Sequence, residues 1–237
     1  MADTVTLSEQ VEALEARIAT LEARIGALEA AGGGGGRRSS GAGSASSSDV
    51  DARDWTTPYV VAELEVAETW IELHETSARP QLQRLIRQVV EEEGPITERL
   101  VLDRVRRAWG LKRAGGRVQE AFDQAVRQLV ARALVERDDD ALRMPGTSLS
   151  TVRVPTGEEA TRRGAEDVPR VELALAMVRA SHAAGGAVAV DDLTMQVAKL
   201  FGWTRRGGAI QERLDAALEL AASRGDVTID GGRVSAA

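Results

Sequence analysis

The N-terminal stretch of the chain carries apolar residues at spacings that alternate between four and three. They are Leu7, Val11, Leu14, Ile18, Leu21, Ile25 and Leu28. This spacing is typical of a coiled-coil seam, and β-branched a positions with leucine at d favour a parallel two-stranded coil. Arg17 and Arg24 fall at g and Glu22 and Glu29 at the following e, so charged pairs can bridge the two chains. We predict a homodimer through residues 1–31. The alternative is an amphipathic helix packed on its own protein, which usually shows a wider apolar stripe.

The apolar pattern stops at residues 32–53. Gly32 to Gly36 cannot continue the helix, and Arg37 to Ser48 is composed almost wholly of Ser, Gly, Ala and Arg. Such a composition has nothing to bury, which predicts a flexible linker. A phosphate-binding loop is not indicated, because no strand precedes the glycines and no Gly-Lys-Ser or Gly-Lys-Thr follows them.

The remainder of the chain is an internal duplication. Residues 109–120 align without gaps on residues 201–212, 92 positions later, and the offset also matches Gly94 with Gly186 and Val105 with Val197. Self-similarity at a fixed offset is the signature of repeated structural units. We expect the two repeats to cover each other's apolar faces and, from about Asp54 onward, to fold without metal or nucleotide.

Each copy shows the same order of predicted elements. In the first, apolar residues at helical spacing predict a helix ended by Gly94-Pro95, a helix opened by Thr97, and a helix over 118–130. A hairpin with Asp138, Asp139 and Asp140 at its tip follows. The second copy predicts helices over 171–183, from an Asp191 cap to Phe201, and over 209–224, with a short strand at 188–190. A hairpin over Gly231-Gly232 closes it.

Three helices followed by a hairpin is the winged-helix plan. The predicted fold class is therefore mainly α: an N-terminal coiled coil, a flexible linker, then two tandem winged-helix-like (α+β) repeats. The expected boundaries are a lead-in helix at 54–79, repeat one at 80–146, a connector at 147–169 and repeat two at 170–237.

Several stretches of this sequence resemble a known family. They are Glu72 to Glu75, Val89 to Pro95 (VVEEEGP), Trp109 to Gly116 (WGLKRAGG), Arg162-Arg163 and Val168-Pro169. Together they resemble the domain of unknown function 3320, found at the C-terminus of large bacterial superfamily-one DNA/RNA helicases. The resemblance implies an accessory module of nucleic-acid enzymes. It carries over no helicase activity, because a coiled coil stands where the helicase and nuclease segments would be.

The candidate catalytic and metal-binding residues all have structural explanations. His74 and His182 lack a neighbouring ligand; His182 aligns with Val90 on the core-facing side of its helix, and His74 is expected in a packing or capping role. The carboxylates form three clusters with structural explanations. Glu91 to Glu93 are expected at a solvated helix end, Asp138 to Asp140 at a hairpin tip, and Asp191-Asp192 at a helix N-cap. We therefore predict no enzyme activity, no cofactor and no metal.

Aromatic and glycine residues surround the turn between the second and third helix of each copy. Trp109 and Trp203 are expected to pack under this turn, with base stacking as the alternative. Gly115, Gly116, Gly207 and Gly208 are expected to form a turn with positive φ, with a phosphate cradle as the alternative.

Charge provides the one sharp functional signal. The chain holds 30 Lys and Arg against 37 Asp and Glu, a net charge of −7, which opposes a dedicated nucleic-acid binder. A local basic cluster nevertheless surrounds the turn of repeat one: Arg104, Arg106, Arg107, Lys112, Arg113 and Arg117. In a helix-turn-helix this part lies nearest the DNA backbone.

Acidic residues weigh against this interpretation. The hairpin tip of repeat one would repel phosphate, and the exposed face of the last helix is net acidic through Glu212, Arg213, Asp215 and Glu219. Two hypotheses therefore stay open. One is a dimer that binds DNA or RNA weakly through repeat one; the other is an adaptor that docks a helicase or nuclease and contacts no nucleic acid.

The location follows from composition. The chain has no cysteine, which fits a reducing compartment, and it shows neither a signal peptide nor a run of the roughly 20 apolar residues that a membrane span needs. We expect a cytoplasmic protein with no membrane contact.

The coiled coil can be tested directly. Replacing Leu14 and Leu21 by Glu places charge at two d positions of a short coil, and we expect this variant to be monomeric where the unmodified chain is dimeric. Light scattering on both chains measures the difference. A monomer in both chains, or an unchanged dimer in the variant, would contradict the prediction.

Overall fold

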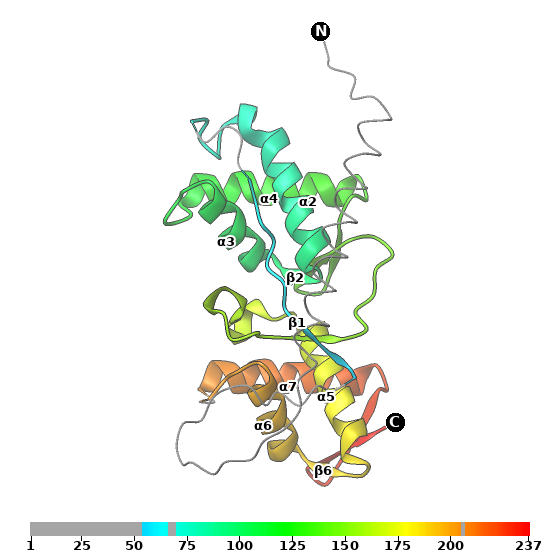
Figure 1. Ribbon diagram of the computed structural model, residues 1–237. Coiled ribbons are helices and arrows are strands. Elements are labelled where there is room, and N and C mark those ends of the chain that lie inside the picture. Colours follow the sequence, from blue (N-terminus) through cyan, green and yellow to red (C-terminus); the bar gives the residue numbers. More distant parts are fainter. Residues whose placement is uncertain (1–53, 66–69, 205–206) are drawn as a thin grey trace, which may run out of the picture. The chain divides into compact units, whose positions relative to one another are not determined.

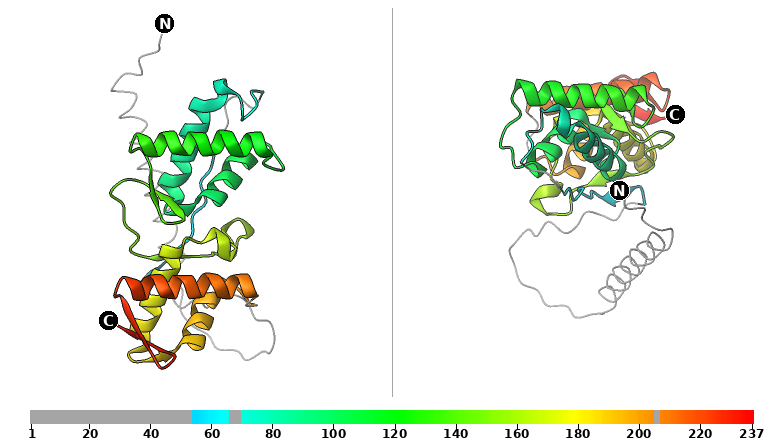
Figure 2. Two further views of the ribbon diagram at one scale, coloured as in Figure 1. Left: turned by 180° about the vertical axis from the view of Figure 1, so that it is seen from behind. Right: turned by 90° about the horizontal axis from the view of Figure 1, so that it is seen from above.

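Two sets of three helices, each associated with a small antiparallel sheet, occupy residues 54–65, 70–204 and 207–237, which are the residues that the computed structural model describes (Figure 1). The first set is α2 (Arg79–Glu93), α3 (Glu98–Ala108) and α4 (Gly116–Ala131). The second is α5 (Arg170–Ala184), α6 (Val190–Leu200) and α7 (Gly208–Ser223). In each set the last helix crosses the other two (Figure 2). The predicted coiled coil at 1–31, with its seam Leu7 to Leu28, and the linker at 32–53 lie outside the described residues.

Each sheet has three strands in the same order. In the first, β4 (Ala141–Arg143) lies between β2 (Ile96–Thr97) and β3 (Glu136–Asp138). In the second, β8 (Arg233–Ala236) lies between β6 (Val188–Ala189) and β7 (Val227–Asp230). All pairings within these sheets are antiparallel. The described chain is thus mainly helical with small sheets, an α+β fold, as the sequence predicted at this level.

The buried positions confirm the duplication and correct its register in the first helix. From α3 onward buried residues match at an offset of 92, as in Val105 with Val197 and Phe122 with Leu214. In the first helix they match at 91 instead, as in Ile86 with Met177, because the loop before the strand is one residue longer in repeat two. Val90 therefore corresponds to Ser181. His182 is exposed, so the prediction that it faces the core was wrong.

Helix and hairpin ends follow local chemistry in most places. The Thr97 hydroxyl accepts a hydrogen bond from the backbone N–H of Leu100 at 3.4 Å and caps α3. Gly231 and Gly232 both adopt positive φ, 52° and 75°, as a tight hairpin turn requires. The predicted Asp191 cap is wrong, because Ala189 holds the N-cap position and Asp191 lies in the first turn of α6. There it still faces the positive end of the helix dipole.

The predicted lead-in helix at 54–79 is also wrong over the described residues. Thr56–Pro58 is a strand, β1, which pairs in parallel with β5 (Val152–Val154) of the connector, and the segment ends in a 3-10 turn at Thr76–Ala78. Consecutive β-branched threonines followed by proline disfavour a helix and suit an extended edge strand. The lead-in and connector segments therefore join each other.

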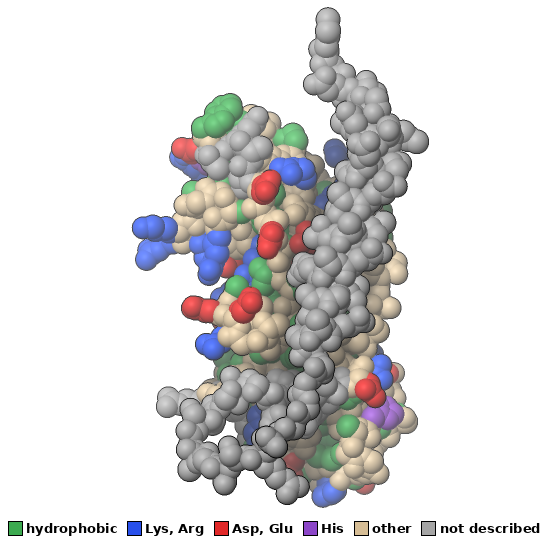
Figure 3. All heavy atoms as spheres, in the orientation of Figure 1, with side chains coloured by type: hydrophobic (Ala, Val, Ile, Leu, Met, Phe, Trp, Pro, Cys, Tyr) green, Lys and Arg blue, Asp and Glu red, His purple; other side chains and the backbone are tan. Residues whose placement is uncertain are grey.

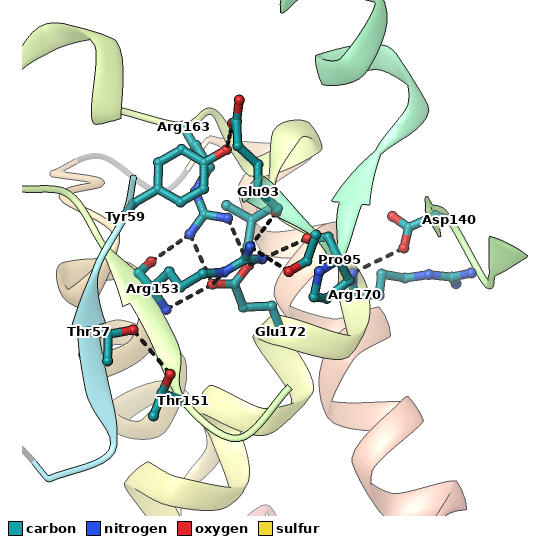
Figure 4. Close-up of polar contacts among 12 residues, drawn as sticks. Thr57, Tyr59, Glu93, Pro95, Asp140, Thr151, Arg153, Arg163, Arg170 and Glu172 are labelled. Carbon is teal, nitrogen blue, oxygen red and sulfur yellow. Dashed lines mark hydrogen bonds and ion pairs between the residues drawn. The ribbon is translucent and has the colours of Figure 1, made fainter. Parts of the chain in front are cut away.

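The repeats have separate hydrophobic cores, contrary to the expectation that they cover each other's apolar faces. One core consists of residues between Ala62 and Leu142, and the other of residues between Val152 and Val234. Polar side chains carry the contact between them (Figure 4). The repeats are joined by charge and hydrogen bonding around β1 and β5.

Glu172 is the centre of this polar contact. Its carboxylate is 0% exposed and forms ion pairs with Arg153 at 2.6 Å and with Arg163 at 2.7 Å. The backbone N–H of Arg153 also donates to it at 2.9 Å. Burial alone would raise the pKa of the Glu172 carboxyl, but the two guanidinium groups and their hydrogen bonds lower it below its ordinary value. Glu172 is therefore a buried anion.

Arg153 ties this anion to the end of α2. Its guanidinium donates to the carbonyl oxygens of Glu93, of Gly94 at 3.2 Å and of Pro95 at 2.6 Å. Carbonyl groups at a helix C-terminus lack partners within the helix and carry partial negative charge. One arginine of the connector thus satisfies the end of a helix in repeat one and a carboxylate in repeat two.

Glu93 is a second buried anion in the same cluster. It is 1% exposed, pairs with Arg104 at 3.1 Å, and accepts hydrogen bonds from the Tyr59 hydroxyl and the Ala62 backbone N–H. The guanidinium carbon of Arg163 lies 3.9 Å from the centre of the Tyr59 ring. Burial and Glu93 raise the pKa of the Tyr59 hydroxyl well above its ordinary value, so it stays a donor. The predicted solvated helix end is correct for Glu91 and Glu92, which are exposed, and wrong for Glu93.

The acidic hairpin tip of repeat one makes a further contact with repeat two. Asp139 pairs with Arg170 and Asp140 pairs with Arg213. Asp140 also accepts a hydrogen bond at 3.1 Å from the backbone N–H of Arg170, at the start of α5. A carboxylate at a helix N-terminus is favoured by the helix dipole. The tip was predicted to repel phosphate, but all three of its charges are paired within the protein, since Asp138 also contacts Arg143 at 3.6 Å.

We expect Glu172→Gln to lower the free energy of unfolding by about 3–5 kcal/mol at neutral pH, because removing one partner leaves buried charges uncompensated. The pKa of Glu172 is lower in the folded than in the unfolded chain. The ionised carboxylate therefore contributes its full stabilisation of the folded state above about pH 4.3, and this stabilisation is lost as the pH falls through the folded pKa. The variant should therefore lose less stability than the unmodified chain on acidification below about pH 4.

Urea unfolding of both chains at several pH values measures this. Glu212→Gln is the matched control, because Glu212 is exposed on α7 and should change stability little. Equal stability of Glu172→Gln and the control would show that the buried anion does not hold the repeats.

Candidate nucleic-acid interface

The turn between α3 and α4 begins with a defined helix end. Gly110 has φ 76°, its N–H donates to the carbonyl of Arg107 at 2.9 Å, and the N–H of Leu111 donates to the carbonyl of Arg106 at 2.8 Å. These bonds form a Schellman motif, which favours glycine at the left-handed position. Half-buried Leu111 packs against the core of repeat one. The motif turns the chain sharply and directs the following residues outward.

Trp109 fixes the turn to the protein. Its side chain belongs to the core at 6% exposure, and its indole N–H donates to the carbonyl of Ile71 at 2.9 Å. The predicted packing role is confirmed for this residue. In repeat two, Trp203 donates to the carbonyl of Arg163 at 2.8 Å and its ring stacks on Phe201 at 5.1 Å. Both turns are thus anchored to the segment that precedes their repeat.

Two of the six predicted site residues are occupied inside the protein. Arg104 pairs with the buried Glu93. Arg106 pairs with Asp103 and donates to the carbonyl oxygens of Leu111 at 3.0 Å and Lys112 at 2.8 Å. Arg106 therefore holds the turn in shape, and neither guanidinium is presented to a ligand.

The other four predicted residues lie exposed around the turn: Arg107, Lys112, Arg113 and Arg117. Arg107 is 67% exposed at its side chain and pairs with Asp103 at 2.7 Å. Among the described residues, the side chains of Lys112, Arg113 and Arg117 form no salt bridge. Figure 3 shows Lys and Arg side chains projecting where Figure 1 has the α3–α4 turn. We call these four residues the basic turn.

The glycines beside the basic turn have ordinary backbone angles. Gly115, the N-cap of α4, has φ −79°, and Gly207 at the same position of α7 has φ −72°. The expectation of positive φ at these glycines and their neighbours Gly116 and Gly208 was wrong; that role belongs to Gly110 and Gly202. A Cβ at Gly115 or Gly116 would meet nothing within 4 Å, so the surface around the start of α4 is open.

The corresponding surface of repeat two differs in charge. Glu212, Asp215 and Glu219 are exposed on α7, whereas Arg213 is turned toward Asp140 and the carbonyl of Val168. The predicted acidic face therefore lacks its one basic member. Arg205 and Arg206 lie outside the described residues.

Other candidate chemistry is sparse. Within residues 54–65, 70–204 and 207–237, no group of three or more His, Cys, Asp and Glu side chains is arranged to hold a metal ion. His74 contacts Glu72 at 3.3 Å. In the same residues, none of the helices combines the length and apolar character needed to cross a bilayer.

Sequence reasoning missed the residues of the buried cluster, namely Tyr59, Glu93, Arg153, Arg163 and Glu172. Two of them belong to stretches already notable for their family resemblance, VVEEEGP and Arg162-Arg163. These family-like stretches were the available signal, but the run of glutamates in VVEEEGP suggested a solvated helix end. A buried ion pair between distant segments leaves no local sequence pattern.

Comparison with known proteins agrees with the resemblance over the first part of repeat one and the segment that precedes it. No curated protein and no solved structure shows significant similarity to the chain. Residues 72–120, from the segment before α2 to the start of α4, match the family model described as a protein of unknown function (DUF3320).

Proposed function

We propose that this protein is a non-enzymatic accessory factor that binds nucleic acid weakly and without sequence specificity through the basic turn. The observation that carries the proposal is the outward display of Arg107, Lys112, Arg113 and Arg117 within one helix end, one turn and one helix start. Phosphate contacts by such side chains supply most of non-specific binding to nucleic acid.

The order of elements supports this use of the turn. We infer that each repeat is a winged-helix-like unit, because three helices are combined with a three-stranded antiparallel sheet that ends in a hairpin. In such units the end of the second helix and the start of the third face the phosphate backbone together. The hairpin of repeat one is engaged with Arg170 and Arg213, so the turn would bind without it.

The N-terminal coiled coil would pair two such sites. Two weak sites on one dimer bind a long strand with higher avidity than one site alone. If residues 32–53 form the flexible linker that their composition predicts, its root-mean-square span would be on the order of 25 Å and would let both sites reach one strand. We propose a reducing, cytoplasmic location because the chain has no cysteine.

The second candidate function is a protein adaptor that docks a helicase or nuclease. The observation that favours it is the exposed acidic face of α7, formed by Glu212, Asp215 and Glu219. This face would repel phosphate and suits a basic protein surface. The two candidates use different faces, so they can be separated by experiment.

We expect binding to a labelled duplex or single strand to weaken with salt at a log–log slope of about −3 to −4, if about four phosphates are neutralised. The affinity should be micromolar or weaker at physiological salt. Replacing Lys112 and Arg113 together by Ala should weaken binding to every sequence alike and reduce the slope by about two units. Fluorescence anisotropy at several salt concentrations measures both quantities.

Arg84→Ala with Arg87→Ala is the matched control, because these exposed residues of α2 carry the same charge away from the turn. It should leave the slope nearly unchanged. The pair Arg205→Ala with Arg206→Ala should also matter less, because the neighbouring face of repeat two is acidic. Absence of salt-dependent binding by the intact chain, even at low ionic strength, would refute nucleic-acid binding and leave the adaptor function.

A further inference from the structure

Trp70 is the most exposed large hydrophobic residue in the described part of the chain. Its side chain is 78% exposed, whereas Trp109 is 6% exposed. Tryptophan offers the largest apolar ring surface of any residue, and proteins usually bury most of it. The exposed face of this ring is available to contact a ligand.

The chain following Trp70 is held firmly on the protein. The carbonyl of the next residue, Ile71, accepts the indole N–H of Trp109 at 2.9 Å, and Leu73 is buried at 2% exposure. The N–H of Glu75 donates to the carbonyl of Glu72 at 2.9 Å and closes a turn. Trp70 is therefore an exposed ring on an anchored backbone, and hydrophobic surface is visible on this segment in Figure 3.

The same segment borders the basic turn on two sides. Trp109, which binds the Ile71 carbonyl, stands in the chain between Arg107 and Lys112. On the other side, His74 and Arg117 line one shallow hollow of about 180 Å³ between this segment and α4. Arg79, Glu75 and Glu120 also line that hollow, so its two arginines are balanced by two carboxylates and it has no excess of positive charge to attract phosphate. The phosphate contacts therefore belong to the turn, and the aromatic contact lies beside them.

We propose that Trp70 stacks on an unpaired base, so that the basic turn and Trp70 together select single-stranded over double-stranded nucleic acid. The proposal rests on the proposed function of the basic turn. Binding of single strands combines a basic surface for the backbone with aromatic rings for the bases. In a duplex the faces of the bases are covered by their neighbours, so a ring at the surface gains little from it.

The duplication supports a role for this position. The helices that follow these segments match at an offset of 91, but the segments themselves can be aligned on a shared contact: the carbonyl of Arg163 binds Trp203 as that of Ile71 binds Trp109. Trp70 then corresponds to Arg162, which is also exposed. The anchored segment thus presents its preceding side chain to solvent in both repeats. Aromatic rings and the guanidinium plane are the two kinds of side chain on which unpaired bases stack.

The test compares Trp70→Ala and Trp70→Phe with the unmodified full-length chain. Ile229→Ala serves as control, because Ile229 is another exposed apolar residue, at 45%, in repeat two. The probes are a labelled oligothymidine, an oligouridine of the same length and a blunt DNA duplex. Trp70→Ala should bind the single strands on the order of tenfold more weakly, with the duplex affinity and the salt slope unchanged. Trp70→Phe should retain most of the affinity, since it keeps an aromatic face.

Intrinsic fluorescence provides a second readout. Stacking should quench tryptophan emission when the unmodified chain binds oligothymidine, and Trp70→Phe should remove most of that quenching. Tighter binding of oligothymidine than of oligouridine indicates a DNA ligand, and the reverse order of affinity indicates RNA.

The outcomes separate the two proposals. If salt-dependent binding persists but Trp70→Ala binds all three probes like the unmodified chain, the stacking inference is wrong and the basic turn stands. An equal loss for single strand and duplex, or a change in oligomeric state in Trp70→Ala, also overturns it in favour of a structural or protein contact. If no probe binds with salt dependence in any chain, both proposals fail.

Discussion

The buried carboxylate of Glu172 is the constraint on which the arrangement of the two repeats depends. It lies in the first turn of α5, and its partner Arg153 simultaneously binds three carbonyl oxygens at the end of α2. Because the two hydrophobic cores are separate, the contact between the repeats depends on these ion pairs and hydrogen bonds as well as on packing. Displacing them would leave a buried ion without its partner, which costs several kcal/mol. Charge pairing therefore gives this contact its specificity, and apolar burial gives each repeat its own stability.

This constraint also shapes the surface that remains for binding. Carboxylate groups of the protein itself pair with Arg104, Arg153, Arg163 and Arg213. Arg106 holds the α3–α4 turn. Repeat one also exposes arginines on α2 and at the end of α4, but Lys112, Arg113 and Arg117 lie within six residues of one another at the basic turn. Salt screens the interaction between charges that lie more than about 10 Å apart. The charges close to a bound phosphate therefore decide whether it is attracted, more than the net charge of the protein does.

Periodicity and turn chemistry were sufficient to predict the local elements. Helical spacing located α2 to α7, and Gly231-Gly232 located the last hairpin, because these signals depend on residues close in sequence. Some failures were local, namely the Asp191 cap, the positive φ expected at Gly115 and Gly207, and the lead-in helix at 54–79. The others concern contacts between distant segments. The burial of Glu93, the pairing of β1 with β5 and the neutralised tip at Asp139 and Asp140 have no local signature. Of the six predicted site residues, four are presented around the turn. Arg104 is instead paired with Glu93 of α2, and Arg106 is held by Asp103 and by carbonyl groups of the turn itself.

The duplication separates what the fold requires from what a site can vary. Both repeats keep a glycine with positive φ after the second helix and an indole N–H bound to the preceding segment, although the tryptophan has moved by two positions, from 109 to 203. These features fix the backbone. The side chains that differ between the copies are those that the shared backbone leaves in solvent, such as Trp70 against Arg162 and the surfaces of α4 and α7. Substitution there costs little stability, because few contacts are lost. Function in this fold is therefore free to diverge between the repeats at these exposed positions while the anchoring residues stay the same.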